Sequence, residues 1–377
     1  MKAEVLVHQI KDLGIRHLIG VPDSTLMEFC NYINGAGKNE FIHTTPHNEG
    51  AAIGMATGVY LSTGKPACVY MQNSGLGNIV NPVTSIANEA VYAIPMLLLV
   101  GWRGEPGVHD EPQHKFMGEI TLKLLEVCDI PYSVISKETS DEELKSILQE
   151  AEKVLNDNRQ YAIVIKRGTF EKQGTSGYTN HYPLVREEAI GTIIKSLRKD
   201  DVVVSTTGKI SREVYEQSDL ILGRHSQEFL TVGGMGHASM IAFGIAKNMS
   251  DRRVICIDGD GAVLMHMGSL AVIGKESPKN YLHICINNDA HESVGGMPTG
   301  AVGQNYHLIA KECGYMATYM VETKADLEKT LENVEHINGP VFIEIKVAME
   351  SRKDLGRPKE TAQENKNSFM SYHGVTK

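Results

Sequence analysis

The stretch ICIDGDGAVLMHMGSLAVIGKESPKNYLHICINNDAHESVGGMPT, from Ile255 to Thr299, decides the fold of this chain. An apolar strand predicted over Val254–Ile257 runs directly into DGDG, and a second apolar strand predicted over Leu282–Ile286 runs into NND. A helix-like connection joins them, as in a βαβ unit, whose two strands are parallel. Asp260 and Asn288 are therefore expected at the carboxyl ends of two parallel strands, the edge where open α/β sheets bind ligands.

The residue types expected at this edge suit a hard cation. The Asp260 carboxylate, the Asn288 amide oxygen and nearby backbone carbonyls are all oxygen donors, which Mg²⁺ prefers, and Mg²⁺ keeps further positions for water and phosphate oxygens. Gly259 and Gly261 flank Asp260 and allow backbone N–H groups to approach a phosphate closely. An ordinary βαβ turn with a helix-capping Asp is the alternative, but it does not explain why both polar groups follow predicted strands.

Short apolar strands and amphipathic helices alternate along the rest of the chain, which predicts an α/β fold with doubly wound parallel sheets. In the first half the predicted strands are His17–Val21, Phe41–Thr44, Cys68–Met71, Met96–Gly101, Tyr132–Ile135 and Ala162–Lys166. In the second half, after a helix over Val185–Leu197, they are Val202–Ser205, Glu228–Val232, Val254–Ile257, Leu282–Ile286, Ala317–Val321 and Val341–Val347. The clearest helix is predicted over Asp141–Leu155, with Ser140 as its cap.

The length of 377 residues favours two domains rather than one. The alternation lapses only in the polar, Gly- and Thr-rich stretch GTFEKQGTSGYTNHYP (168–183), which is typical of a linker. We therefore expect a first domain over residues 1–168, a linker over 169–184, a second domain over 185–350, and a polar tail over 351–377 that either covers the second domain or is disordered.

Composition excludes several classes of partner. The net charge of −9 argues against nucleic acid and anionic membranes, and means that an anionic substrate needs a locally basic pocket. The longest apolar run, Ala93–Val100, is far short of the ~20 residues that span a membrane. The first residues, MKAEVLVHQIKDLG, fit an amphipathic helix and not a signal peptide. Six scattered cysteines without CxxC spacing indicate free thiols. A cytoplasmic protein is expected.

The spacing of the two polar groups resembles a known motif. GDG (259–261) followed 28 positions after Asp260 by Asn288 resembles the metal–diphosphate motif of thiamine diphosphate enzymes. The resemblance implies that Mg²⁺ is held by Asp260, Asn288 and the carbonyl of Ala290, and that Gly261 and Ala262 lie near the diphosphate of the cofactor. It also implies the thiamine diphosphate-binding fold in both domains.

Three further segments match this family and imply other cofactor contacts. Thr207 and Gly208 in TTGK (206–209) are implied to contact the diphosphate. Gly233 and Met235 in TVGGMGH (231–237) are implied to wedge the cofactor into a bent shape, although this segment lacks the G-x-G-x-x-G spacing of a dinucleotide site. Ser74 and Gly75 in QNSGLGN (72–78) resemble the loop over the pyrimidine ring, with Leu76 where many members have proline.

Glu49 is the residue implied to activate the cofactor. It lies in PHNEGAA (46–52), where a strand is expected to join a helix. Taken alone, it reads as a carboxylate that complements the helix dipole. The family places a glutamate in this setting against a pyrimidine nitrogen, and the resemblance extends to Asp23 and His47 as further catalytic candidates.

Across nearly the whole chain the motifs resemble those of phosphonopyruvate decarboxylases. They are VPDSTL (21–26), PHNEGAAIGMATG (46–58), QNSGLGNIVNP (72–82), GWRGEPGVHDEPQH (101–114), NNDAHESVGG (287–296) and SRKDLGRP (351–358). The two-domain length, without a middle domain, fits this group. The resemblance implies decarboxylation of 3-phosphonopyruvate to phosphonoacetaldehyde and CO₂ in phosphonate biosynthesis. One departure is Met297, where a Gln is the group's pattern.

Binding of the phosphonate requires a basic or N–H-rich recess. Candidates are Arg103, His47, His114 and the amides of Val294 and Gly295, the last two as a helix N-terminus. His109, Asp110 and His114 could instead mimic a metal cluster, but a polar loop at the active site is the preferred interpretation.

Other interpretations stay open. A sulfopyruvate decarboxylase, whose halves are often separate chains, shares the fold and cofactor. A thiamine diphosphate-dependent carboligase or synthase would trap a second carbonyl compound, and a non-catalytic relative would only bind the cofactor. The family also implies a homo-oligomer with active sites at the subunit interface, whereas a site within one chain is the alternative.

Overall fold

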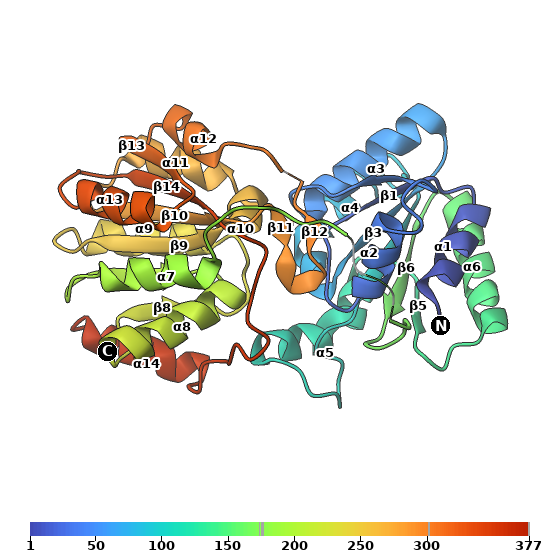
Figure 1. Cartoon of the computed structure of the whole chain (residues 1–377). Coiled ribbons are helices and arrows are strands. Elements are labelled where there is room, and N and C mark those ends of the chain that lie inside the picture. The colour runs from blue at the N-terminus through green and yellow to red at the C-terminus, as the bar shows by residue number, and fades with distance from the viewer. Residues whose placement is uncertain (173, 175–176, 301, 376–377) are drawn as a thin grey trace. The chain divides into compact units, whose positions relative to one another are not determined.

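The computed structural model describes residues 1–172, 174, 177–300 and 302–375. The chain divides into two compact units (Figure 1). The first comprises Met1–Tyr178 and His291–Gly300, and the second comprises Thr179–Ala290 and Ala301–Lys377. Each unit is built around its own parallel sheet of six strands.

The first unit alternates strands and helices, as its sequence pattern predicts. Its elements are α1 (Ala3–Asp12), β1 (His17–Gly20), α2 (Met27–Asn34), β2 (Ile42–Thr44), α3 (Glu49–Thr63), β3 (Ala67–Gln72), η1 (Asn73–Gly75), α4 (Leu76–Ser85), β4 (Met96–Gly101), α5 (Pro112–Val127), β5 (Tyr132–Ile135), α6 (Asp141–Asn156) and β6 (Gln160–Ile165). The sheet order is β2-β1-β3-β4-β6-β5.

The second unit repeats this alternation. Its elements are α7 (Arg186–Lys195), β7 (Val202–Ser205), α8 (Lys209–Leu222), β8 (Glu228–Leu230), α9 (Ala238–Asn248), β9 (Val254–Gly259), α10 (Asp260–Met265), α11 (Gly268–Glu276), β10 (Tyr281–Asn287), α12 (Tyr306–Glu312), β13 (Ala317–Val321), α13 (Lys324–Val334), β14 (Val341–Lys346) and α14 (Ala362–Tyr372). After β10 the chain forms the short strand β11 (Ala290–His291), followed by η2 (Glu292–Val294) and β12 (Met297–Pro298), which both belong to the first unit.

The two sheets share one topology. The second sheet has the order β13-β14-β10-β9-β7-β8. If the six strands of each sheet are numbered in chain order, both sheets have the order 2-1-3-4-6-5. In each sheet the strand order reverses beside the unit's first strand, between β1 and β3 and between β7 and β9. Such switch points leave a crevice at the carboxyl ends of the strands, where ligands bind in doubly wound folds.

Helices cover both faces of each sheet and bury its apolar side chains. In the first unit, α1, α2 and α6 contribute to the core on one face, and α3, α4 and α5 to the core on the other. In the second unit, α7, α8 and α13 contribute to one core, and α9, α11, α12 and α14 to the other. Because both faces are covered, the central strands are apolar throughout and not alternating.

The predicted strands are confirmed, with differences of one or two residues at their ends. Helix α6 begins as expected, since the Ser140 side chain accepts a hydrogen bond from the Glu143 amide at 3.2 Å. The tail contains α14, which packs on the edge strand β8: Asn365 accepts from the Leu230 amide and donates to the Glu228 carbonyl. The six cysteines are free thiols. No helix within the described ranges has the length and apolar character needed to cross a membrane.

Candidate active site

Asp260 is the first residue of α10, directly after β9. Its side chain is only 5% exposed, and its Oδ2 atom has no hydrogen-bond partner among the described residues. Burial raises the pKa of this carboxyl to about 7, and the nearby Asp289 carboxylate also raises it. The Gly261 amide and the Lys346 ammonium act in the opposite direction. A buried carboxylate oxygen without a partner is unfavourable unless a cation compensates it. The site therefore fits a metal ligand.

Asn288 and Ala290 follow the neighbouring strand. Ile286 of β10 lies opposite Gly259 of β9 in the parallel register, so the residues after both strands emerge at the same edge. The Asn288 Oδ1 atom accepts a hydrogen bond from the Ala290 amide at 3.1 Å. Together with Asp260 and the Ala290 carbonyl, this gives the all-oxygen donor set that Mg²⁺ prefers.

The predicted diphosphate contacts lie around the switch point of the same sheet. Thr207 follows β7, and its hydroxyl accepts the Gly233 amide at 3.1 Å. Gly208 precedes α8 with a φ of +97°. An added Cβ at Gly236 would lie 3.0 Å from the Ala262 carbonyl oxygen, so the glycine-rich segment of Met235 packs closely on α10. Glycine-rich segments of this kind let the backbone approach a phosphate closely.

Glu49 is the first residue of α3 in the other unit, with the Asn48 side chain capping the helix by accepting the Ala51 amide at 2.9 Å. The Glu49 carboxyl is 5% exposed, and its Oε2 atom accepts a hydrogen bond from Asn78 Nδ2 at 2.7 Å. A Cβ added at Gly75 would lie 2.6 Å from Glu49 Oε1. Gly75 therefore makes room for the carboxyl, and Asn78 orients it.

Asp23 belongs to a hydrogen-bonded chain that joins the ends of β1 and β3. Its Oδ2 atom accepts the Thr25 amide at 2.7 Å, and its Oδ1 atom accepts a short hydrogen bond from Gln72. Gln72 Oε1 in turn accepts from the exposed Ser74 hydroxyl at 2.7 Å. Asp23 and Ser74, two predicted site residues, are thus brought together through Gln72. His47 is exposed, two residues before Glu49.

Arg103 is held by Asp110. Its Nε and Nη2 atoms donate to the two carboxylate oxygens at 2.7 and 2.5 Å, and Nη1 donates to the Ser24 hydroxyl at 2.8 Å. Burial alone would raise the pKa of the Asp110 carboxyl, but these hydrogen bonds hold that pKa well below its usual range. Burial and the Arg103 charge lower the pKa of His114. Arg103 is a fixed, charge-balanced group that leaves two of its five N–H groups without an acceptor among the described contacts.

The segment with Val294 and Gly295 differs from expectation. No helix begins here: η2 ends at Val294 and β12 follows, so these amides do not form the expected helix N-terminus. The prediction failed because a glycine pair before a polar stretch is compatible with either a helix start or a tight turn. The turn is the observed form, since Gly295 has a φ of +119°. Met297 is 1% exposed, and its sulfur accepts from Asn34 Nδ2 at 3.2 Å, so it is a core residue of the first unit.

A second cluster of metal-type side chains lies inside the core of the second unit. Candidate ligand atoms of Cys256, Asp258 and His283 lie within 4.8 Å of one another, and all three residues are buried. His283 lies 3.5 Å from Asp258 and 3.1 Å from the Tyr315 hydroxyl. We interpret this group as a buried Asp–His–Tyr network, because it lies along the strands and not at the sheet edge.

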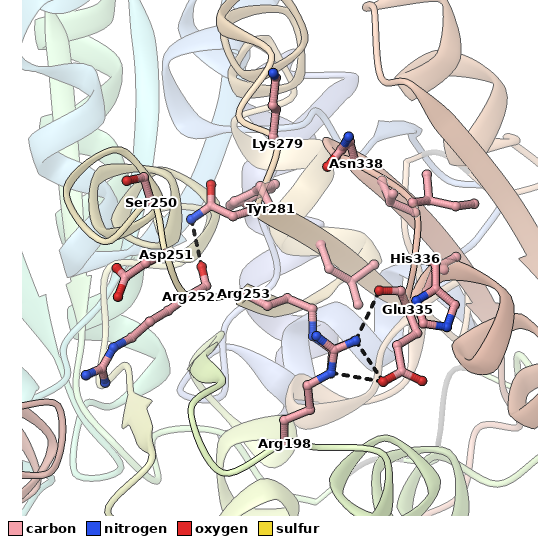
Figure 2. Close-up of a pocket in the computed structure, with 16 residues that line it drawn as sticks. Arg198, Ser250, Asp251, Arg252, Arg253, Lys279, Tyr281, Glu335, His336 and Asn338 are labelled. Carbon is pink, nitrogen blue, oxygen red and sulfur yellow. Dashed lines mark hydrogen bonds and ion pairs between the residues drawn. The ribbon is translucent and has the colours of Figure 1, made fainter.

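A cavity of about 200 Å³ in the second unit is not the active site. It is lined by residues that precede β9, β10 and β14, so it lies at the amino ends of the strands, opposite Asp260. Its cations do not converge: Arg198 pairs with Glu335, and Arg252 and Lys279 point in other directions (Figure 2).

The sequence pattern did not point to several residues that lie beside the candidate site residues of each unit. They are Gln72 and Asn78 in the first unit and Asn180, Tyr182 and Lys346 in the second. Gln72 and Asn78 lie within the QNSGLGN motif (72–78), so the motif could have identified them as candidate site residues. Asn180 and Tyr182 lie in a polar stretch, where no periodicity points to a role.

Comparison with known proteins agrees with this geometry. The N-terminal TPP binding domain of thiamine pyrophosphate (diphosphate) enzymes matches residues 2–125, and the C-terminal TPP binding domain matches residues 207–345. A phosphonopyruvate decarboxylase of Streptomyces viridochromogenes is 33% identical, over 97% of this chain and 94% of that protein. One from Streptomyces hygroscopicus is 31% identical, over 99% and 94%.

A sulfopyruvate decarboxylase of Methanosarcina acetivorans is also similar, with 28% identity over 78% of each chain. The predicted fold, of two thiamine diphosphate-binding domains without an evident middle domain, is confirmed, and so is the predicted family. The chain therefore belongs to the thiamine pyrophosphate-dependent decarboxylases, in the family that includes the phosphonopyruvate decarboxylases.

Proposed function

We propose that this chain decarboxylates 3-phosphonopyruvate to phosphonoacetaldehyde and CO₂, using thiamine diphosphate and Mg²⁺, as a cytoplasmic enzyme of phosphonate biosynthesis. In this reaction the bond between the carboxylate and the keto carbon breaks, and a proton replaces the departing CO₂. The observation that favours this substrate is the match to two phosphonopyruvate decarboxylases over nearly the full length of the chain.

The metal half of the proposal rests on Asp260. Its unpartnered, buried Oδ2 atom lies at the edge where Asn288 and Ala290 also present oxygen atoms. These three residues would hold Mg²⁺, and the segments of Thr207, Gly208 and Gly233 would bind the diphosphate.

Glu49 is the proposed activating residue. When bound, thiamine diphosphate supplies the electron sink that accepts the electrons of the breaking carbon–carbon bond. The Oε2 atom of Glu49 already accepts from Asn78, so Oε1 is the atom that would share a proton with a ring nitrogen. Asp23, held through both carboxylate oxygens, and the exposed His47 are proposed to hold or move protons at the substrate.

Arg103 is the proposed anchor of the phosphonate. Its two uncommitted N–H groups can donate to a phosphonate oxygen while Asp110 keeps the guanidinium fixed. His114 lies close enough for the Arg103 charge to lower its pKa, and it is proposed to complete the recess. A charge-balanced anchor binds an anion through directed hydrogen bonds more than through net charge.

The proposed assembly is a homo-oligomer with active sites at subunit interfaces. Helix α3, which begins with Glu49, is apolar on nearly all sides, which is typical of a helix that is buried. On one of its faces Gly54, Gly58 and Leu61 are exposed, Leu61 to 73%. A second copy of the chain would cover this face. Sedimentation of the full chain tests the assembly: a dimer or larger is expected, and a monomer with full activity would contradict it.

Product analysis separates the proposed reaction from the alternatives. Phosphorus-31 NMR of a reaction with phosphonopyruvate, thiamine diphosphate and Mg²⁺ should show phosphonoacetaldehyde as the only new phosphonate. A carboligase would form a coupled product when a second aldehyde is added. Unchanged phosphonopyruvate with bound cofactor would favour a non-catalytic relative and refute the proposal.

A further inference from the structure

We propose that Asn180 and Tyr182, in the segment that precedes the second sheet, are positioning residues for the metal-binding loop of Asn288, Asp289 and Ala290. Neither residue is a candidate metal ligand. This inference rests on the proposed Mg²⁺ site, and it assigns a function to a segment that the sequence pattern presents as a plain linker.

Asn180 ties two neighbouring strand ends together. Its Nδ2 atom donates to the Asn288 carbonyl at 2.8 Å and to the Val347 carbonyl at 3.1 Å. Its Oδ1 atom accepts the Met349 amide at 2.9 Å. The three hydrogen bonds use both donors and the acceptor of the side chain, so the amide is fixed in one orientation. The backbone of Asn288 is thereby attached to the end of β14.

Tyr182 fixes the next residue of the loop. Its hydroxyl donates to Asp289 Oδ2 at 2.7 Å. Asp289 has a φ of +57°, a left-handed conformation that is uncommon outside glycine and needs support from its surroundings. Its amide donates to Asn287 Oδ1 at 2.9 Å, which supplies part of that support.

A buried lysine completes the support of Asp289. The Lys346 ammonium lies 3.6 Å from Asp289 Oδ1 and 3.2 Å from Glu344 Oε1, and it lies 5.6 Å from the centre of the Tyr182 ring. Tyr182 therefore contacts both members of the Asp289–Lys346 pair. Removing the Tyr182 hydroxyl takes one hydrogen bond from the Asp289 carboxylate, which is buried and cannot replace that bond with one to bulk water.

Asp289 is the residue between Asn288 and Ala290, so its conformation sets how these two residues present their oxygens. Contacts that orient metal ligands without touching the metal typically contribute about 10- to 100-fold to metal affinity. By linkage, a metal that favours this loop conformation also favours docking of Asn180 and Tyr182. Cofactor binding and the position of the segment are thus coupled.

The test measures thiamine diphosphate binding by titration calorimetry as a function of Mg²⁺ concentration, on the wild-type chain and on N180A and Y182F. Both variants should need about 10- to 100-fold more Mg²⁺ for half-saturation. Hydrogen exchange at residues 179–182 should slow when Mg²⁺ and cofactor bind, and this effect should be lost in N180A.

Two matched controls separate positioning from general stability. Asn280, in the same unit, also donates its side-chain amide to backbone carbonyls, those of Ala246, Met249 and Arg252, but at the opposite edge of the sheet. N280A should lower the melting temperature and leave the Mg²⁺ requirement unchanged. Tyr132 donates to the Glu126 carboxylate at 2.9 Å in the other unit, so Y132F should also leave it unchanged.

D260N distinguishes failure of this inference from failure of the proposed site. If D260N loses Mg²⁺-dependent cofactor binding while N180A and Y182F keep the wild-type Mg²⁺ requirement, the inference alone is overturned. Normal Mg²⁺-dependent binding in D260N would overturn the metal site and this inference with it. If N180A does not fold, Y182F, which removes a single hydroxyl, decides the outcome.

Discussion

Substitution of Gly75 by alanine tests the proposed role of Glu49 with one methyl group. The added Cβ would lie 2.6 Å from Glu49 Oε1 and 2.7 Å from its Cδ, whereas ordinary contacts begin near 3.4 Å. The carboxyl must therefore move by about 0.8 Å. The backbone itself tolerates alanine, because Gly75 has a φ of −69°.

A displacement of about 1 Å at a reacting group can cost ~100-fold in rate, which corresponds to about 2.7 kcal/mol of barrier. We expect kcat for decarboxylation to fall by about this factor in G75A, while the melting temperature changes little. G244A is the matched control, because an added Cβ in the exposed part of α9 meets no atom within 4 Å. Stopped-flow or coupled assays of CO₂ release give kcat. Wild-type kcat in G75A would refute the claim that the position of the Glu49 carboxyl limits the reaction.

The remaining predictions concern pH, substrate binding and stability. Because burial raises the pKa of Asp260 to about 7 from 3.8, a proton competes with Mg²⁺, and Mg²⁺ affinity measured by calorimetry should rise about tenfold from pH 6 to pH 8. For the same reason the metal-free folded chain binds a proton that the unfolded chain releases, so its free energy of unfolding should fall as pH rises from about 4 through 7. D260N should reduce this slope, and the remainder should include Glu228, whose pKa burial also raises to about 7. R103M should raise KM for phosphonopyruvate about 10- to 100-fold, since charge-assisted hydrogen bonds contribute about 1.5–3 kcal/mol, and should change KM for pyruvate little. Equal effects on the KM values of both substrates would show that Arg103 does not bind the phosphonate. Arg186 and Glu213 form a buried ion pair with hydrogen bonds of 2.7 and 2.8 Å. R186M leaves the Glu213 carboxylate without this partner, so its free energy of unfolding in urea should be about 3–5 kcal/mol lower than that of the wild type. An unchanged urea midpoint would contradict this.

The strands were predictable because they are buried on both faces. Runs such as Met96–Gly101 and Tyr281–Asn287 are apolar at almost every position and end in glycine or polar residues, so their position and parallel arrangement follow from local pattern. Asp260 and Asn288 could be placed at one edge for the same reason. Each of them directly follows one of these buried strands, β9 or β10.

Contacts between distant residues were not predictable from such patterns. Asn180 and Asn288 are 108 positions apart, and neither the polar linker nor the loop has a periodicity that would pair them. Arg103 could be identified as a basic residue in a polar loop, but its pairing with Asp110 depends on a loop conformation that sequence does not specify. The assignment of residues 291–300 to the first unit likewise depends on Met297 entering a core formed by residues far away in the chain.

The measurement that tests the proposed function most directly is CO₂ release from phosphonopyruvate, sulfopyruvate and pyruvate in parallel, each with and without thiamine diphosphate and Mg²⁺. The proposal predicts rapid turnover of phosphonopyruvate that depends on both additions, with kcat/KM well above that for the other two acids. A preference for sulfopyruvate would leave the fold and cofactor assignment intact and contradict the proposed substrate. No release of CO₂ from any of the three by cofactor-loaded protein would contradict the proposed decarboxylation itself.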